Sequence, residues 1–179
     1  MNRRALLQSL AGLVALPLLP AILRAAETMV PPGSKFKPSP SIVPLKKTAA
    51  AWRALLPPAA YNVLFEAGTE RPFTSPLLNE HRAGTFVCAA CHLSVFESQN
   101  KFESGTGWPS FTQGIVGHIG IQSDHVLIEQ RTECHCARCG GHLGHIFDDG
   151  PQPRGERWCI NGVALNFTIK GQPLPALRT

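Results

Sequence analysis

Two cysteine pairs with the same spacing constrain this chain more than any other feature of its sequence. Cys88 and Cys91 form one C-x-x-C pair, and Cys136 and Cys139 form the other. Zn²⁺ binds four thiolates tetrahedrally, and a gap of two residues lets one tight turn present two sulfurs at the required separation. The pairs therefore predict one four-thiolate zinc site that joins two hairpins far apart in the chain.

The cysteine content also allows a disulfide interpretation, because an exported protein can oxidise its thiols in many pairings. Paired C-x-x-C motifs on two turns favour zinc over disulfides. His92 and His135 each follow or precede a predicted ligand. We expect each of them to lie at the surface or beside the site rather than to be a fifth ligand.

Two of the cysteines, Cys134 and Cys159, are not needed for the metal. Cys159 follows Arg157 closely and lies downstream of His142 and His145. Arginine and histidine near a thiol lower its pKa and make it a nucleophile. The alternative is that Cys159 is a small buried hydrophobe, as free cysteines often are.

The stretch from Cys159 to Ile169 alternates between apolar and polar residues and predicts a strand. A period of two places Arg157, Cys159 and Asn161 on one face of that strand. Apolar residues of the same parity continue this face toward the core: Val163, Leu165, Phe167 and Ile169. We therefore expect the nucleophile to lie at the end of one rigid strand.

Several motifs, taken in order, resemble the signature blocks of methionine-R-sulfoxide reductases of the MsrB type. They are Gly107-Trp108-Pro109-Ser110-Phe111, His142-Leu143-Gly144-His145-Ile146-Phe147, Asp149-Gly150-Pro151 and Arg157-Trp158-Cys159-Ile160-Asn161. The segment Gly68-Thr69-Glu70-Arg71-Pro72-Phe73 is similar as well. The resemblance runs from about residue 48 to about residue 170.

The resemblance implies that Cys159 attacks the sulfoxide sulfur. The sulfoxide oxygen must be protonated for its bond to sulfur to break, and this requires an acid beside the thiolate. The histidine pair matches that of the family, with His145 as the principal acid and His142 holding the oxygen or a water. Taken alone, an H-x-x-H pair is as easily a metal pair or two surface histidines.

Further site residues follow from the same resemblance. Asp149 and Arg157 would set the charge states of the histidine and the thiolate, and Asn161 would orient substrate or water. An indole supplies the apolar wall that the S-methyl group of the substrate needs, which is the role implied for Trp108. Without the resemblance, Trp108 is a core aromatic at a turn.

The sequence departs from the family pattern at one position. Many members carry a resolving cysteine in the Ser-Gly-x-Gly-Trp block, where this chain has Thr106. A sulfenic acid on Cys159 cannot condense with a thiol there. Cys134 is either a buried structural residue, which we favour, or an alternative resolving cysteine. The third alternative is direct reduction of Cys159 by an external thiol.

The resemblance implies a mainly β fold with two small antiparallel sheets, short N-terminal helices and a zinc site remote from catalysis. The 16 glycines and 16 prolines agree with many turns. We expect one helix from Thr48 as N-cap through Leu56, and a second from Pro58 to Ala67 with Gly68 as terminator. Val126-Leu127-Ile128 begins a β stretch that ends near Cys136.

The N-terminus resembles a twin-arginine export signal. Arg3 and Arg4 precede an apolar stretch over residues 6–23. We expect the signal to span residues 1–26, followed by a proline-rich linker over 27–47, a catalytic domain over 48–170 and a C-terminal tail over 171–179. Export to the periplasm follows; the alternative is an uncleaved membrane anchor.

The charge of this chain gives little support for nucleic-acid binding. The formal net charge is +5, and three of the arginines lie in the predicted signal. We expect a monomeric enzyme that uses a thioredoxin-like or other thiol reductant to reduce methionine sulfoxide, free or in oxidised proteins, and so repairs oxidative damage. The competing functions are a zinc-ribbon module that binds protein or nucleic acid, and a thiol peroxidase.

Overall fold

The structure is a computed structural model that describes residues 41–124 and 131–179. The predicted signal, most of the predicted linker and the segment Val126-Leu127-Ile128 lie outside these residues. The elements are α1 (Ala49–Leu55), α2 (Pro58–Glu66), η1 (Pro76–Asn79), β1 (Gly84–Cys88), β2 (Ser94–Glu97), η2 (Ser98–Asn100), β3 (Lys101–Phe102), β4 (Ser110–Phe111), β5 (Ile119–Asp124), β6 (Arg131–Cys136), β7 (His142–Phe147), β8 (Arg157–Ile160), η3 (Gly162–Ala164) and β9 (Leu165–Ile169).

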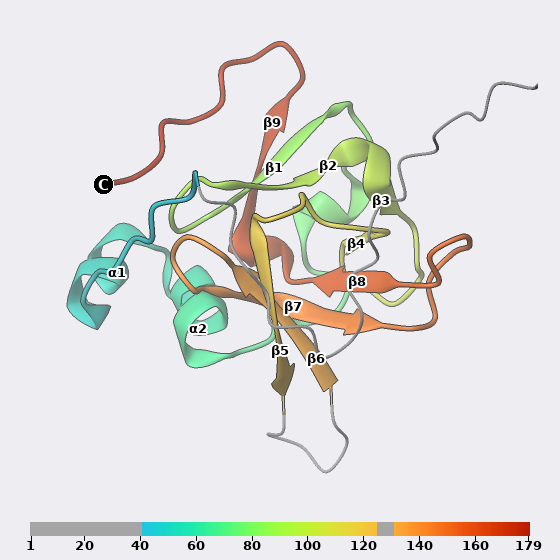
Figure 1. Ribbon diagram of the computed structural model, residues 1–179, viewed down its shortest axis with the longest axis horizontal. Helices are drawn as coiled ribbons and strands as arrows, with labels where there is room; N and C mark the ends of the chain where they lie inside the picture. Colours follow the sequence, from blue (N-terminus) through green and yellow to red (C-terminus); the bar gives the residue numbers. More distant parts are fainter. Residues whose placement is uncertain (1–40, 125–130) are drawn as a thin grey trace, which may run out of the picture. The chain divides into compact units, whose positions relative to one another are not determined.

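The strands form two sheets (Figure 1). The smaller has the order β2-β1-β9, and the larger has the order β3-β4-β8-β7-β6-β5. All strand pairs are antiparallel. The prediction of a mainly β fold with two antiparallel sheets and short N-terminal helices is confirmed.

Local signals define both helices. The Thr48 side chain accepts a hydrogen bond from the Ala51 amide at 3.2 Å, which satisfies one free donor of the first turn. Pro58 occupies the first position of α2, where its missing N–H costs nothing. Each helix ends one residue before the predicted boundary. Ala67, rather than Gly68, takes the left-handed conformation that ends α2.

Aromatic rings from both sheets meet in the core. Phe96 of β2 stacks on Phe111 of β4 at 4.3 Å between centroids, and Phe86 of β1 meets Phe111 edge-on at 5.0 Å. Trp158 and Ile160 of β8 are both buried in this core. Since side chains alternate along a strand, the residue between them faces away from these rings. Strand β8 is thereby anchored through Trp158 and Ile160, and Cys159 points to the other face.

The prediction of one strand from Cys159 to Ile169 is wrong. Strand β8 ends at Ile160, the turn η3 follows, and β9 pairs with β1 in the other sheet. The Glu70 carboxylate accepts the N–H groups of Gly162 and Val163, which bends the chain there. A Cβ atom on Gly162 would lie 1.8 Å from the Ser75 hydroxyl, so only glycine fits at this turn. The turn leaves Asn161 outside the strand.

Segments on both sides of the predicted 48–170 domain contact it. The Leu45 amide donates to the Arg138 carbonyl at 2.7 Å, and Ile42 and Leu45 pack against the core. From the other end, the Arg178 amide donates to the Cys91 carbonyl at 3.2 Å. Within the described residues, none of the helices combines the length and apolar character needed to span a bilayer.

Candidate active site and metal centre

Two turns with the same backbone pattern present the four thiols of the C-x-x-C pairs. In the first, the His92 amide donates to the Cys88 carbonyl at 2.9 Å, and His92 takes a positive φ of 63°. In the second, the Gly140 amide donates to the Cys136 carbonyl at 2.9 Å, with a φ of 74°. Each turn closes four residues after its first cysteine, which points both thiols of the pair the same way.

The four sulfurs form one compact cluster, as predicted. All four lie within 4.8 Å of one another, with Cys88 and Cys139 at 3.7 Å and Cys91 and Cys136 at 3.5 Å. A tetrahedron with metal–sulfur bonds of ~2.3 Å has sulfur–sulfur edges of about 3.8 Å. The observed separations fit that geometry. These cysteines are compatible with a structural metal ion.

The two predicted neighbours of the cluster contact other parts of the chain. The Nδ1 atom of His92 lies 2.9 Å from the Ala176 carbonyl, and its Nε2 atom accepts from Arg178 at 3.1 Å. The ring of His135 lies over Gly120, where a Cβ atom would be 2.1 Å from Nε2. His92 therefore contacts the C-terminal tail, and His135 fills space against β5.

The second unit of the site is a row of side chains that crosses the larger sheet. Glu133 of β6 pairs with His145 of β7, which pairs with Cys159 of β8, which pairs with Ser110 of β4. Residues directly opposite each other in an antiparallel sheet project to the same face. A carboxylate, an imidazole, a thiol and a hydroxyl are therefore aligned on one side.

Cys134 belongs to the other face of the same sheet. It pairs with Gly144, which pairs with Ile160, and it is fully buried in the core. Burial raises the pKa of the Cys134 thiol above its ordinary value, because the interior disfavours the thiolate. The sheet therefore separates Cys134 from Cys159, which projects from the opposite face.

A bulge in β7 brings the two histidines together. In a regular strand, His142 and His145 would project to opposite faces, because they are three residues apart. Cys134 pairs with Gly144, but the next residue of β6 pairs with His142, so Leu143 is an extra residue in β7. The extra residue turns His142 back to the site face, where its ring lies 5.2 Å from that of His145.

Asn161 holds this bulge. Its amide N–H donates to the Leu143 carbonyl at 2.9 Å, and its side-chain Nδ2 donates to the same oxygen at 3.1 Å. The remaining side-chain oxygen accepts from the Glu70 amide at 3.0 Å. Because Asn161 is buried and both ends of its carboxamide are bonded, its contacts position the histidine strand.

Glu133 is the carboxylate partner of the histidine pair. His142 Nδ1 lies 2.8 Å from Glu133 Oε1, and an ionised carboxylate only accepts, so Nδ1 carries a proton. This contact fixes the orientation of the His142 ring. The other ring nitrogen, Nε2, is then the atom that can exchange protons with a bound molecule. The hydrogen bond from His142 lowers the pKa of Glu133, against the opposing effect of burial. Glu133 stands in the predicted β stretch, but no motif singled it out.

Arg157 and Asp149 form an ion pair beside Cys159. Arg157 donates from Nε and Nη2 to the two oxygens of Asp149 at 2.8 and 3.0 Å, which lowers the pKa of Asp149. The guanidinium also lies 4.3 Å from the centroid of the Phe147 ring. Both contacts hold the arginine on the face that carries Cys159.

Burial raises the pKa of the Cys159 thiol. The charge of Arg157 opposes that rise, as do hydrogen bonds from Thr106 and from Arg157. The expected lowering by arginine is therefore present, but the effect of burial is larger. The contribution of Thr106 was not anticipated from the sequence.

Trp108 lies in a loop that is fastened to the same centre. Its indole N–H donates to the Glu70 carbonyl at 3.1 Å, and its ring is partly exposed. The neighbouring Gly107 carbonyl accepts from the Phe73 amide at 2.7 Å. Glu70 thus connects the indole with Asn161 and the η3 turn, although only its place in a similar motif had drawn attention to it.

The fold and these contacts define a mainly β protein with a thiol-centred site on one sheet and a separate four-thiol centre. The SelR domain family matches residues 56–169. Relatives named peptide methionine sulfoxide reductase MsrB are 52% identical over 127 residues in Bradyrhizobium diazoefficiens and 46% identical over 125 residues in Methanosarcina mazei. Each match covers 69% of this chain, and 90% and 89% of the respective relative. The chain belongs to the SelR domain family, that of the MsrB proteins.

The hydrogen-bonded pair of Glu133 and His142 predicts that the stability of the folded protein depends on pH. A carboxyl whose folded pKa is depressed contributes stability that is complete above its unfolded pKa and is lost as pH falls through the folded value. Glu133→Gln should cost about 1–3 kcal/mol of unfolding free energy at pH 7, as expected for a partly buried hydrogen bond to a charged group. The difference in unfolding free energy between Glu133→Gln and the parent protein should shrink below pH ~4.5.

Urea unfolding at a series of pH values measures this difference. Glu103→Gln, which removes an exposed carboxyl together with its ion pair to Lys101, is the matched control and should show a small difference. A Glu133→Gln difference that stays constant from neutral to acid pH would contradict the assigned pair.

Proposed function

We propose that this protein reduces the R epimer of methionine sulfoxide to methionine, in oxidised proteins and as the free amino acid, and so repairs oxidative damage. One observation carries the proposal. His145 of β7 lies directly opposite Cys159 of β8 in the larger sheet, and the bulge in β7 brings His142 to the same face. The relatives are named as reductases of peptide methionine sulfoxide, which supports methionine sulfoxide as the substrate class.

The geometry supports a two-electron reduction at Cys159. The thiolate attacks the sulfoxide sulfur while His145 delivers a proton to the oxygen, and His142, held by Glu133, keeps that oxygen or a water in place. The attack forms a bond between Cys159 Sγ and the substrate sulfur, and the oxygen, once protonated twice, leaves that sulfur as water. A water then attacks Cys159 Sγ and gives up a proton, the bond between Sγ and the substrate sulfur breaks, and methionine leaves with the electron pair, so that Cys159 is left as a sulfenic acid. Trp108 packs against the S-methyl group.

Regeneration uses an external thiol reductant, such as a thioredoxin-like protein. One thiol displaces the oxygen of the sulfenic acid as water and forms a mixed disulfide, and a second thiol releases Cys159. Two observations support this route. Cys134 is buried on the opposite face of the sheet, and Thr106 offers a hydroxyl where a resolving thiol is common.

Replacement of Cys159, the proposed nucleophile, is the direct test of its role. Cys159→Ser should lower the reduction of R-sulfoxide peptides by ~10³-fold or more, since a hydroxyl is a far weaker nucleophile. Turnover of both epimers with a chemical thiol, and of hydrogen peroxide as the peroxidase alternative, measures this. Cys134→Ser is the control and should retain activity. Near-parent activity of Cys159→Ser would refute the assignment.

The four-thiol cluster holds Zn²⁺ with a structural role. Four thiolates leave no open position on a tetrahedral ion, so the metal would stabilise the fold and take no part in the reaction. The donors come from the turn after β1 and the turn after β6, which belong to different sheets. Zinc would therefore join the two sheets.

Removal of one ligand tests this role, because metal binding and folding share one free energy. Cys91→Ser or Cys139→Ser should lose zinc and lower the melting temperature by ~10 °C or more. Metal analysis and thermal unfolding under reducing conditions provide the readout. The account fails if the parent protein, purified with a reductant, holds no zinc and carries the four cysteines as disulfides.

The protein is exported through its N-terminal segment to the periplasm. The twin arginines and the apolar stretch over residues 6–23 support this proposal, and they lie outside the described residues. Changing Arg3 and Arg4 together to lysine should leave the precursor inside the cell. Cell fractionation measures the result, and export of the double variant at the parent level would argue for another route.

A further inference from the structure

Residues of the C-terminal tail lie across the turn that carries the first cysteine pair. The Arg178 amide donates to the Cys91 carbonyl at 3.2 Å, and the Arg178 side chain donates from Nε to His92 Nε2 at 3.1 Å. Because Nε2 accepts, the proton of the neutral His92 ring lies on Nδ1, which is 2.9 Å from the Ala176 carbonyl. Three hydrogen bonds therefore join the tail to this turn.

Arg138 joins the second cysteine turn to both of these partners. It lies between the predicted ligands Cys136 and Cys139 in the sequence. Its guanidinium donates from Nη1 to the Cys91 carbonyl at 3.2 Å and from Nη2 to the Arg178 carbonyl at 2.7 Å. Because a guanidinium is planar and rigid, these two bonds fix the separation of the tail and the first turn. The tail, the first turn and the second turn therefore share one hydrogen-bonded contact.

The exposure of the tail residues agrees with a specific contact. Leu174 and Leu177 are each 51% exposed, whereas Arg178 is partly buried. An arginine is thus more covered than the leucines beside it, which is the reverse of what apolar burial alone would give. At the centre itself, three of the four thiols are buried and Cys139 is partly exposed. The hydrogen bonds to the cysteine turns account for the position of Arg178.

These contacts act on the way a metal ion would leave the site. Zinc leaves the four thiols when the two turns move apart, because each turn supplies two of the ligands. With Zn²⁺ bound, the four thiolates would give the centre two net negative charges, which the guanidinium groups of Arg138 and Arg178 oppose. Removal of a group that surrounds a metal's ligands typically costs ~10–100-fold in metal affinity. The contacts of both arginines therefore act against opening of the site.

We propose that residues 176–178 form a clasp on the four-thiol centre, which together with Arg138 holds the two cysteine turns in contact and slows the release of Zn²⁺. The inference rests on the proposed zinc ion. The clasp lies outside residues 56–169, which match the SelR domain, so it is a property of this chain's own tail. It gives the tail a positioning role at the metal centre that is distinct from the reaction at Cys159.

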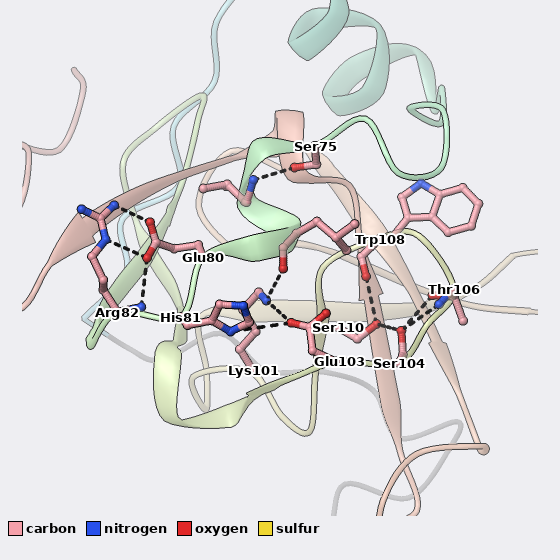
Figure 2. Close-up of polar contacts among 12 residues, drawn as sticks. Ser75, Glu80, His81, Arg82, Lys101, Glu103, Ser104, Thr106, Trp108 and Ser110 are labelled. Atoms are coloured by element: carbon pink, nitrogen blue, oxygen red, sulfur yellow. Dashed lines mark hydrogen bonds and ion pairs between the residues drawn. The ribbon is translucent and has the colours of Figure 1, made fainter.

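Zinc transfer to the chromogenic chelator pyridylazoresorcinol measures the release rate in the reduced, zinc-loaded protein. A chain that ends at Pro175 lacks the clasp and should release zinc ~10-fold faster than the parent protein. Arg178→Ala should show a smaller increase, since the backbone bonds at this position remain. The matched control is Arg82→Ala, which removes the same charge from an exposed ion pair with Glu80 (Figure 2) and should release zinc at the parent rate.

The rate of unfolding in urea, measured on the same proteins, separates a clasp from a general loss of stability. Opening of the turns is a local event, so the truncation should accelerate zinc release more than it accelerates unfolding. Truncation that leaves the release rate unchanged, or that raises both rates equally, would overturn the proposal. Should the truncated chain fail to fold, Arg178→Ala decides in the same way, and release at the parent rate would refute the clasp.

A second comparison tests the shared contact with Arg138. Because Arg138 bonds to the Arg178 carbonyl, the truncation should have a smaller effect in the Arg138→Ala variant than in the parent. Equal effects in the two proteins would contradict the shared contact. A parent protein without zinc would refute the proposed ion and the clasp together, whereas a protein that behaves as expected here but reduces no sulfoxide would refute the proposed reductase activity alone.

Discussion

The rest of the structure depends on the junction of the two sheets at the four-thiol cluster. Cys88 ends β1 of the smaller sheet and Cys91 follows it, whereas Cys136 ends β6 of the larger sheet and Cys139 lies between β6 and β7. Their turns are closed by the same carbonyl-to-amide bond, which holds the two sulfurs of each pair close together. A tetrahedral ion there would fix the start of β7, the strand that carries both histidines.

The candidate active site requires an irregular strand. A regular β7 would place His142 in the opposite direction to His145. The extra residue Leu143 corrects this. Its carbonyl has no partner on the neighbouring strand, and two hydrogen bonds from Asn161 satisfy it instead. Asn161 is in turn bonded to Glu70, whose carboxylate bends the chain at η3. The same contacts that break the strand after Ile160 therefore hold the histidines in place.

The parts of this arrangement that the sequence predicts are those set by short-range geometry. The spacing of the C-x-x-C pairs, the Thr48 cap and the position of Pro58 each involve only a few neighbouring residues, and the structure agrees with each. Alternation also placed Arg157 and Cys159 on one face of β8. The motifs further identified the family to which the chain belongs.

The errors and omissions arise from contacts between distant segments. The alternation from Cys159 to Ile169 continues across η3, so the strand break that Glu70 imposes leaves no local signal. The bulge at Leu143 is a property of two paired strands, and one strand alone does not reveal it. Glu133 was missed for the same reason, because its partner His142 lies on another strand.

The central claim is that Cys159 works as a single thiol, with Cys134 separated from it by the sheet. Reaction of the reduced protein with one equivalent of an R-sulfoxide peptide, followed by dimedone trapping and peptide mass spectrometry, tests this most directly. The account predicts one equivalent of methionine peptide, a dimedone adduct on Cys159 and an unmodified Cys134. A disulfide between Cys134 and Cys159 would contradict it.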